Sequence, residues 1–160
     1  DASGAEATLL SAGAHLEAGR IEPALDALLE VVGEVGLAGI VATNTTVARA
    51  GLSTPPERVQ QIGAGGLSGP PLATRAREVV ARARAKLGTR ATIIGVGGVS
   101  TGEDALAMMD AGADLVQFYT AFVYRGPSTP KRVASELLLA RERRQRTELL
   151  SSPSANDKRP

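Results

Sequence analysis

The feature that most constrains the fold is an apolar run, residues 93–99, that contains two adjacent glycines. Its first residues suit a buried parallel strand, which in α/β proteins is a nearly continuous apolar segment. Glycine allows a positive φ angle, and its missing Cβ lets a backbone N–H approach an anion closely. Gly97 and Gly98 therefore predict a turn after a strand, either a plain βα connection or a turn that holds a phosphate.

A helix and a second strand are expected after this turn. Ser100 and Glu103 have the S-x-x-E spacing of a capping box, and apolar residues recur with helical spacing as far as Gly112. Residues 113–120 then read as a strand, so the segment forms one βαβ unit. This strand ends in two hydroxyl-bearing residues, Tyr119 and Thr120. Glycines and hydroxyls at the ends of consecutive parallel strands are similar to the phosphate site of many (β/α)8 barrels, which lies after strands 7 and 8.

Helices and strands alternate along the rest of the chain, which predicts an α/β fold without an internal repeat. A helix begins at Pro23, and a strand is expected at 39–43. The following loop, residues 44–71, is longer than the usual βα connection of about 2 to 6 residues, and such loops often belong to sites. The apolar stripe of the first helix consists of Leu25, Leu28, Leu29, Val32 and Val35.

Two further helices are expected. The helix at 72–87 places Val79, Ala83 and Leu87 on one apolar face, and a last helix starts at Pro130. Four arginines on the other faces of the helix at 72–87 are expected to be solvated: Arg75, Arg77, Arg82 and Arg84. The predicted divisions of the chain are a divergent or inserted segment at 1–20, a partial barrel at 21–146, and a disordered tail at 147–160.

The composition excludes several classes of function. Aromatic residues make up 2% of the chain and the formal net charge is +1, so neither base stacking nor a strong field favours a nucleic-acid partner. Cysteine is absent, and the one histidine, His15, cannot form a metal cluster by itself and is expected at the surface. No apolar run reaches the roughly 18 to 20 residues that span a bilayer, and no signal peptide is recognised. We expect a globular domain without a metal site.

Four phrases, in this order and at matching spacing, resemble the C-terminal part of dihydroorotate dehydrogenase, and the resemblance runs from about Gly36 to Leu138. The strand ending Gln-Phe-Tyr-Thr and the later Tyr-Arg-Gly-Pro, residues 124–127, are similar to the quinone-reducing, membrane-associated class 2 of that family. The four phrases are ATNTT at 42–46, GGLSGPPL at 65–72, IIGVGGV at 93–99 and VQFYT at 116–120.

The resemblance implies both a fold and a function. The fold is the C-terminal part of a (β/α)8 TIM barrel, about strands 6–8 with their helices, and is incomplete on its own. The function is oxidation of (S)-dihydroorotate to orotate with FMN and a quinone in de novo pyrimidine (UMP) biosynthesis. The resemblance also implies an enzyme peripheral to the cytoplasmic (inner) membrane, which it contacts through N-terminal helices that have no counterpart here.

The resemblance assigns a role to each candidate site residue. Thr43 contacts the flavin at the end of the sixth strand, and Asn44 and Thr45 hydrogen-bond the orotate, in keeping with an amide that offers both a donor and an acceptor. Gly97 shapes a turn. The residues that hold the FMN phosphate and ribityl end, through backbone N–H groups and the threonine hydroxyl, are Gly69, Gly98, Tyr119 and Thr120.

Much of the family's machinery has no counterpart in this sequence. A barrel needs eight strands in roughly 250 residues, and the catalytic base serine and the flavin lysine lie on earlier strands of the family. Ser68 has no neighbouring general base and is interpreted as a loop residue. The chain alone is expected to be inactive, to hold FMN weakly and to self-associate. Two alternatives stay open: a noncatalytic truncated chain or pseudoenzyme, and another FMN- or phosphate-binding barrel enzyme.

Overall fold

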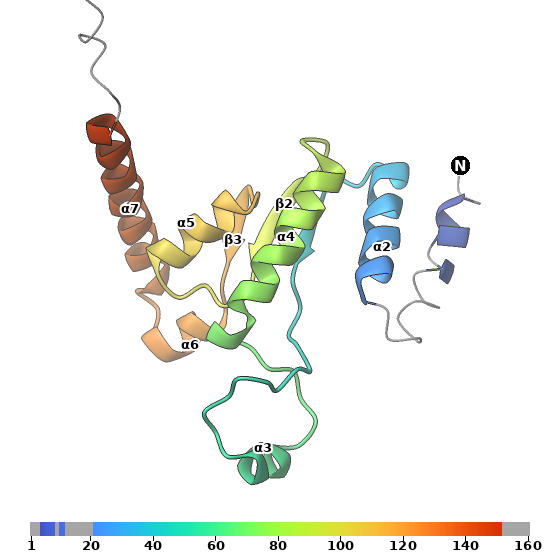
Figure 1. Ribbon diagram of the computed structural model, residues 1–160, viewed down its shortest axis with the longest axis horizontal. Helices are drawn as coiled ribbons and strands as arrows, with labels where there is room; N and C mark the ends of the chain where they lie inside the picture. Colours follow the sequence, from blue (N-terminus) through green and yellow to red (C-terminus); the bar gives the residue numbers. More distant parts are fainter. Residues whose placement is uncertain (1–3, 9, 12–20, 152–160) are drawn as a thin grey trace, which may run out of the picture.

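The computed structural model describes residues 4–8, 10–11 and 21–151, and Figure 1 shows the alternation of its helices and strands. Residues 4–8 and 10–11 are helical. His15, for which a surface position was predicted, lies outside the described residues. The later elements are α2 Ile21–Val35, β1 Gly39–Ala42, α3 Pro56–Ile62, a 3-10 turn η1 Pro70–Leu72, α4 Ala73–Leu87, β2 Thr92–Val96, α5 Gly102–Asp110, β3 Leu115–Gln117, α6 Thr120–Arg125 and α7 Thr129–Ser151.

Three parallel strands form one sheet in the order β1-β2-β3. Helix α4 lies in the crossover from β1 to β2, and α5 lies in the crossover from β2 to β3, because parallel strands need long connections. The pairing aligns Ile40 with Ile93 and Ile94 with Leu115. Three sequential parallel strands with flanking helices confirm the prediction of a partial (β/α)8 barrel.

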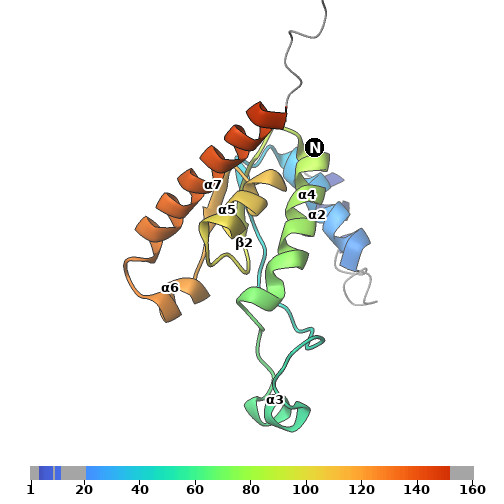
Figure 2. The same ribbon diagram turned by 60° about the vertical axis from the view of Figure 1, so that its left-hand side comes forward.

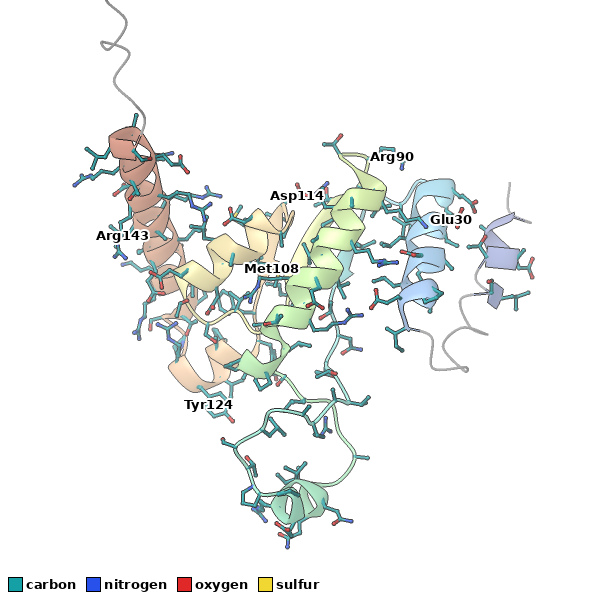
Figure 3. All side chains as sticks on the ribbon, viewed as in Figure 1. Glu30, Arg90, Met108, Asp114, Tyr124 and Arg143 are labelled. Carbon is teal, nitrogen blue, oxygen red and sulfur yellow. The ribbon has the colours of Figure 1, made fainter. Side chains whose placement is uncertain are left out.

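The core lies between one face of the sheet and helices α4 and α5 (Figure 1). Ile93 of β2 and Val80 of α4 are fully buried, whereas Val79, predicted to lie on the apolar face of this helix, is partly buried and packs against the core. A Cβ on Gly95 would lie 2.5 Å from Cγ of Met108, which Figure 3 shows between α5 and α4. Glycine at this position lets α5 pack against the sheet, and each large side chain buried there contributes about 1.5–3 kcal/mol.

The opposite face of the sheet carries apolar side chains that no described helix covers. Val41, Ile94 and Leu115 are paired in register across the three strands and therefore share this face. Val41 is 59% exposed and Leu115 is 56% exposed. In a closed barrel the equivalent face is filled by side chains from the whole ring of strands. We call these three residues the open-face row.

The start of α5 differs from the prediction. The capping box is formed by Thr101 and Asp104, not by Ser100 and Glu103. The Thr101 hydroxyl accepts a hydrogen bond from the Asp104 N–H at 3.1 Å, and the Asp104 carboxylate accepts one from the Thr101 N–H at 2.9 Å. Both pairs have the required spacing. The observed one lets the same carboxylate accept from the Ser100 N–H at 3.0 Å as well.

The predicted strand at 113–120 is shorter in the structure. β3 ends at Gln117, opposite Val96, where its neighbour β2 also ends. Beyond this point the chain has no partner strand, because β2 is followed by the glycine turn. Tyr119 is the N-cap residue of α6, and Thr120 is its first residue, so the two hydroxyl-bearing residues lie at a helix start rather than in a strand.

The connection between β1 and α4 contains α3, a helix that the sequence analysis did not predict. The root of this connection is closed by an antiparallel bridge between Thr46 and Leu67, with N–H to carbonyl distances of 3.1 and 2.7 Å. Arg49 donates to the Thr46 carbonyl at 3.1 Å and also bonds to the Gly65 carbonyl. Two views show α3 at the tip of a loop that extends away from the sheet (Figures 1 and 2). We call residues 46–67 the β1–α4 lobe.

The last helix, α7, is longer than the sequence pattern predicts. α7 continues to Ser151, past residue 146, where a disordered tail was predicted to begin. Arg144, shortly before this extension, donates to both carboxylate oxygens of Asp110 on α5, at 2.8 and 2.7 Å. Residues 152–160 lie outside the described part. No helix in the described ranges combines the length and apolar character needed to cross a membrane.

Three of the α4 arginines are paired rather than merely solvated. Arg75 forms an ion pair with Glu22 of α2, and Arg82 donates through Nε to Asp26 of the same helix at 2.6 Å. Arg84 is paired with Asp114 before β3. These contacts link α4 to its neighbours, and exposed pairs of this kind contribute about 0–1 kcal/mol each. The α2 stripe is correspondingly only partly buried: Leu29 and Val32 are buried, whereas Leu28 and Val35 are exposed.

Candidate functional site

A cavity of about 490 Å³ lies at the carboxyl ends of the three strands. In parallel α/β sheets this edge is where ligands bind, because the connecting loops from neighbouring strands converge there. All eight residues that the sequence analysis selected line the cavity: Thr43, Asn44, Thr45, Gly69, Gly97, Gly98, Tyr119 and Thr120.

Thr43 extends the sheet toward the cavity. Its N–H donates to the Val96 carbonyl at 2.7 Å, and its hydroxyl also donates to that carbonyl, at 3.3 Å. Both bonds fix Thr43 against the last residue of β2. The next residues of the chain therefore leave the sheet at the edge of the cavity.

The Asn44 side chain is oriented by its neighbour. Its Oδ1 accepts a hydrogen bond from the Thr45 N–H at 2.7 Å and is 3.4 Å from the Thr45 hydroxyl, which donates to it. This local contact uses the amide acceptor. Asn44 therefore presents its Nδ2 as a hydrogen-bond donor, where the sequence analysis expected a donor and an acceptor together.

The glycine turn after β2 is required by packing. Gly98 has φ +74°, and a Cβ there would lie 2.5 Å from the Cβ of Ala73, in the first turn of α4. A Cβ on Gly97 would lie 2.7 Å from the Cβ of Ala76. The sequence pattern predicts that these glycines form either a plain βα turn or a turn that holds a phosphate; the structure adds that α4 occupies the space a side chain would need. Within the described residues, neither glycine N–H has a hydrogen-bond partner, so both remain free to bind an anion.

Ser68 and Thr120 bring the end of the β1–α4 connection and the start of α6 together at the cavity. The Thr120 hydroxyl donates to Oγ of Ser68 at 2.9 Å. Gly69 next to it has φ +83°, and a Cβ there would lie 3.2 Å from Cγ2 of Thr120. The sequence analysis treated Ser68 as a plain loop residue. In the sequence, only the GGLSGPP phrase indicates that Ser68 lies at the cavity, because its partner Thr120 is 52 positions away.

The described residues that line the cavity are uncharged. They combine hydroxyls, amides and glycine backbone with apolar side chains, and include no Asp, Glu, Lys, Arg or His. Gln117 at the end of β3 adds an amide that the sequence analysis missed. Among the described residues, no cluster of His, Cys, Asp and Glu could hold a metal ion. Such a lining can bind and orient a polar ligand, and it is suited to a phosphate through N–H and O–H donors.

Sequential parallel strands with glycine turns and hydroxyls at their carboxyl ends define this chain as part of a (β/α)8 barrel. The family model of dihydroorotate dehydrogenase matches residues 21–140. The chain belongs to the dihydroorotate dehydrogenase family. This confirms the resemblance that the four sequence phrases carry.

Relatives of known name and structure agree with this assignment. The chain is 54% identical over 109 residues to a dihydroorotate dehydrogenase (quinone) of Thermobifida fusca, and 58% identical over 99 residues to one of Nocardioides. A crystal structure of DHODH from Eimeria tenella in complex with ferulenol matches with a TM-score of 0.66 and 35% identity. That match covers 75% of this chain and 31% of the Eimeria chain.

The matched segment is a minor part of each relative. It covers 68% of this chain but 29% of the Thermobifida protein, and 62% of this chain but 28% of the Nocardioides protein. The chain therefore spans about three-tenths of the length of these curated relatives.

Proposed function

We propose that this chain provides the FMN-phosphate half-site and part of the substrate site of a class 2 dihydroorotate dehydrogenase. The enzyme oxidises (S)-dihydroorotate to orotate and delivers the electrons to a quinone, in pyrimidine biosynthesis. The observation that carries the proposal is the convergence of all eight candidate residues on one cavity, from loops after three different strands.

The residues at the cavity fit an FMN phosphate. The unpartnered N–H groups of Gly97 and Gly98 and the hydroxyls of Ser68 and Thr120 offer several donors at one place. Gly69 permits close approach of its loop to Thr120. Charge-assisted hydrogen bonds from such donors are the usual means of holding a phosphate. FMN, when bound, would supply the redox chemistry, namely hydride acceptance from dihydroorotate and electron delivery to the quinone.

The substrate is held from the β1 side of the cavity. Asn44 donates from Nδ2 to a carbonyl or carboxylate oxygen of the pyrimidine, because its Oδ1 is already engaged by Thr45. The Thr45 hydroxyl is close enough to Asn44 to bind the same group. Thr43, fixed to Val96, lines the cavity beside the flavin. These residues bind and orient the ligand.

Removal of the C5 proton requires a base, which the described cavity residues do not supply. Ser68 contacts Thr120 at 2.9 Å, and none of the described lining residues has a carboxylate or imidazole to activate it. In the proposed enzyme the base is the family's serine, on a strand that precedes this segment. The membrane-contacting helices of class 2 enzymes also precede it, so the quinone and the cytoplasmic membrane are partners of the whole enzyme.

The test joins this chain to the preceding part of the Thermobifida fusca relative. The resulting chimaera is expected to purify with bound flavin and to reduce a quinone with dihydroorotate, whereas the 160-residue chain alone shows no turnover. The chimaera also separates the proposal from the two alternatives. A folded chimaera that binds flavin without oxidising dihydroorotate would indicate another FMN enzyme. A folded chimaera without flavin would indicate a noncatalytic chain.

A further inference from the structure

We propose that Arg125 and Glu136 form a positioning pair that holds the two sides of the phosphate site together. One side is the glycine turn at Gly97 and Gly98, and the other is the start of α6 at Thr120. The inference rests on the proposed FMN half-site and adds two residues that do not line the cavity.

Arg125 connects α6 to the loop that follows the glycine turn. Helix α6 has six residues, with Thr120 at its first position and Arg125 at its last. The Arg125 guanidinium donates through Nη1 to the carbonyl of Ser100, which follows Gly98 by two residues along the chain. Its Nη2 donates to Oε1 of Glu136 on α7 at 3.1 Å. One side chain thus spans the gap between α6 and the loop.

Glu136 holds the far end of the same loop. Its Oε2 accepts a hydrogen bond from the N–H of Gly102 at 2.8 Å. Close packing reinforces this contact, because a Cβ on Gly102 would lie 2.1 Å from the backbone nitrogen of Leu137. The Gly102 N–H, and to a smaller degree Arg125, hold the pKa of Glu136 below its ordinary value, so the carboxylate is ionised at neutral pH.

The loop is therefore fixed from two directions. Asp104 binds the N–H groups of Ser100 and Thr101 from within α5, at 3.0 and 2.9 Å. Arg125 and Glu136 bind the Ser100 carbonyl and the Gly102 N–H from α6 and α7. If the pair is broken, the glycine turn loses its connection to Thr120, and the phosphate donors on the two sides can separate. A binding site that depends on donors from both sides then weakens.

The experiment compares FMN with riboflavin, which has the same flavin and lacks the phosphate. Binding of each to the 160-residue chain is measured by flavin fluorescence anisotropy, and the ratio of the two Kd values gives the phosphate preference. Arg125→Met and Glu136→Gln are each expected to lower this preference roughly tenfold, equivalent to about 1.4 kcal/mol. The Glu136→Gln amide has one oxygen where the carboxylate has two, so one of the two donors loses its acceptor.

The two variants change the net charge of the chain in opposite directions. This distinguishes a role in positioning the phosphate donors from long-range attraction of the phosphate. Arg125→Met removes a positive charge and Glu136→Gln removes a negative one, so long-range electrostatics alone predicts that the second variant binds FMN more tightly. Tighter binding by Glu136→Gln would overturn the proposal. Arg125→Lys keeps the charge but reaches one acceptor, and it is expected to restore the preference in part; full restoration would also overturn the proposal.

A control and a ligand-free measurement complete the design. Arg144→Met breaks a similar arginine–carboxylate pair away from the cavity and is expected to leave the phosphate preference unchanged. Hydrogen exchange of the ligand-free chain is expected to be faster at residues 98–102 in both Arg125→Met and Glu136→Gln. Unchanged exchange there would overturn the positioning role. A wild-type chain that binds FMN and riboflavin equally would instead refute the FMN half-site, and exchange would still decide whether the pair holds the loop.

Discussion

The hydroxyl of Thr120 donates a hydrogen bond to Oγ of Ser68 across 52 positions of sequence, at 2.9 Å. The contact joins the last loop of the cavity to the end of the β1–α4 connection. The two hydroxyls carry two protons and their contact uses one of them, so the other proton is left for a ligand. A phosphate in the cavity would thus receive an oriented donor.

Thr120→Val is expected to weaken FMN binding while leaving riboflavin binding nearly unchanged. Valine keeps the shape of threonine but removes the hydroxyl, and loss of one hydrogen bond of this kind costs about 0.5–1.5 kcal/mol. Titration of both flavins into the chain measures the effect. The control is Thr147→Val on α7, whose hydroxyl donates to the Arg143 carbonyl at 3.0 Å. Equal losses for FMN and riboflavin would argue against a phosphate contact.

Asn44→Ala in the chimaera is expected to retain flavin and to lower kcat/KM for dihydroorotate about five- to 150-fold. The variant leaves a buried polar group of the substrate without its donor, at a cost of about 1–3 kcal/mol. Steady-state kinetics at saturating quinone measure the loss. Gln61→Ala, which removes an amide from the remote helix α3, serves as the control. An unchanged kcat/KM for Asn44→Ala would remove Asn44 from the substrate site.

Gly95→Ala is expected to destabilise the chain by about 1–3 kcal/mol through overpacking. The added methyl would lie 2.5 Å from Cγ of Met108 and 2.9 Å from the Cβ of Ala113. Urea denaturation followed by circular dichroism measures the free energy of unfolding. Gly33→Ala in α2 is the matched control and is expected to raise the free energy of unfolding. Its added Cβ would lie 4.0 Å from the nearest neighbouring atom, and alanine favours the helix. Equal stability of wild type and Gly95→Ala would contradict the tight packing of α5.

Asp114 is expected to make stability depend on acid pH. Its carboxylate accepts a hydrogen bond from the Ile93 N–H at 2.7 Å and pairs with Arg84, and these contacts, in that order, lower its pKa. A carboxyl with a lowered folded-state pKa stabilises the fold above its ordinary pKa of about 3.9, and this contribution is lost as the pH falls through the folded value.

The stability difference between wild type and Asp114→Asn should therefore be larger at pH 6 than at pH 3. Chemical denaturation at both pH values measures this difference, and carbon NMR of the carboxyl group gives the pKa directly. A folded-state pKa at or above the ordinary value would contradict the assignment of these contacts.

The open-face row is expected to make the isolated chain self-associate. Val41 and Leu115 expose apolar surface beside two unpaired strand edges, and such edges pair readily with other chains. Leu115→Lys should shift the chain toward the monomer in size-exclusion chromatography with light scattering. Leu149→Lys, at an exposed leucine of α7, is the control. A wild-type chain that runs as a monomer at high concentration would contradict this expectation.

The strands and the glycine turn were predictable because their signals are local. Residues 93–98 contain both the apolar run that predicts the strand and the glycines that end it. The four phrases, in their order along the chain, predicted the barrel topology and the candidate site residues. Val79 and Val80 could not be ranked from the sequence, since both lie within the apolar arc of α4. The end of β3 at Gln117 depends on where β2 ends, which is information from another segment.

The polar contacts could not be predicted from the sequence, because they too join segments that are far apart along the chain. Arg84 bonds to Asp114 and Arg125 to Glu136, and each pair forms only because helices and strands bring distant segments together. Charge patterns along a single helix predicted solvated arginines instead. The Ser68–Thr120 bond is of the same kind: two common residues whose meeting depends on the register of the whole sheet.

The bridge between Thr46 and Leu67 has an evolutionary consequence. Both of its hydrogen bonds run between backbone groups, so almost any pair of residues could form them. Between Arg49 and Gly65, which bond to each other, the β1–α4 lobe can therefore gain, lose or exchange residues without moving Asn44 on one side or Gly69 on the other. Gly66 is excluded, because a Cβ there would collide with the side chain of Thr45. Natural variation and engineered insertions can accumulate in the lobe, while the cavity at its root keeps its shape.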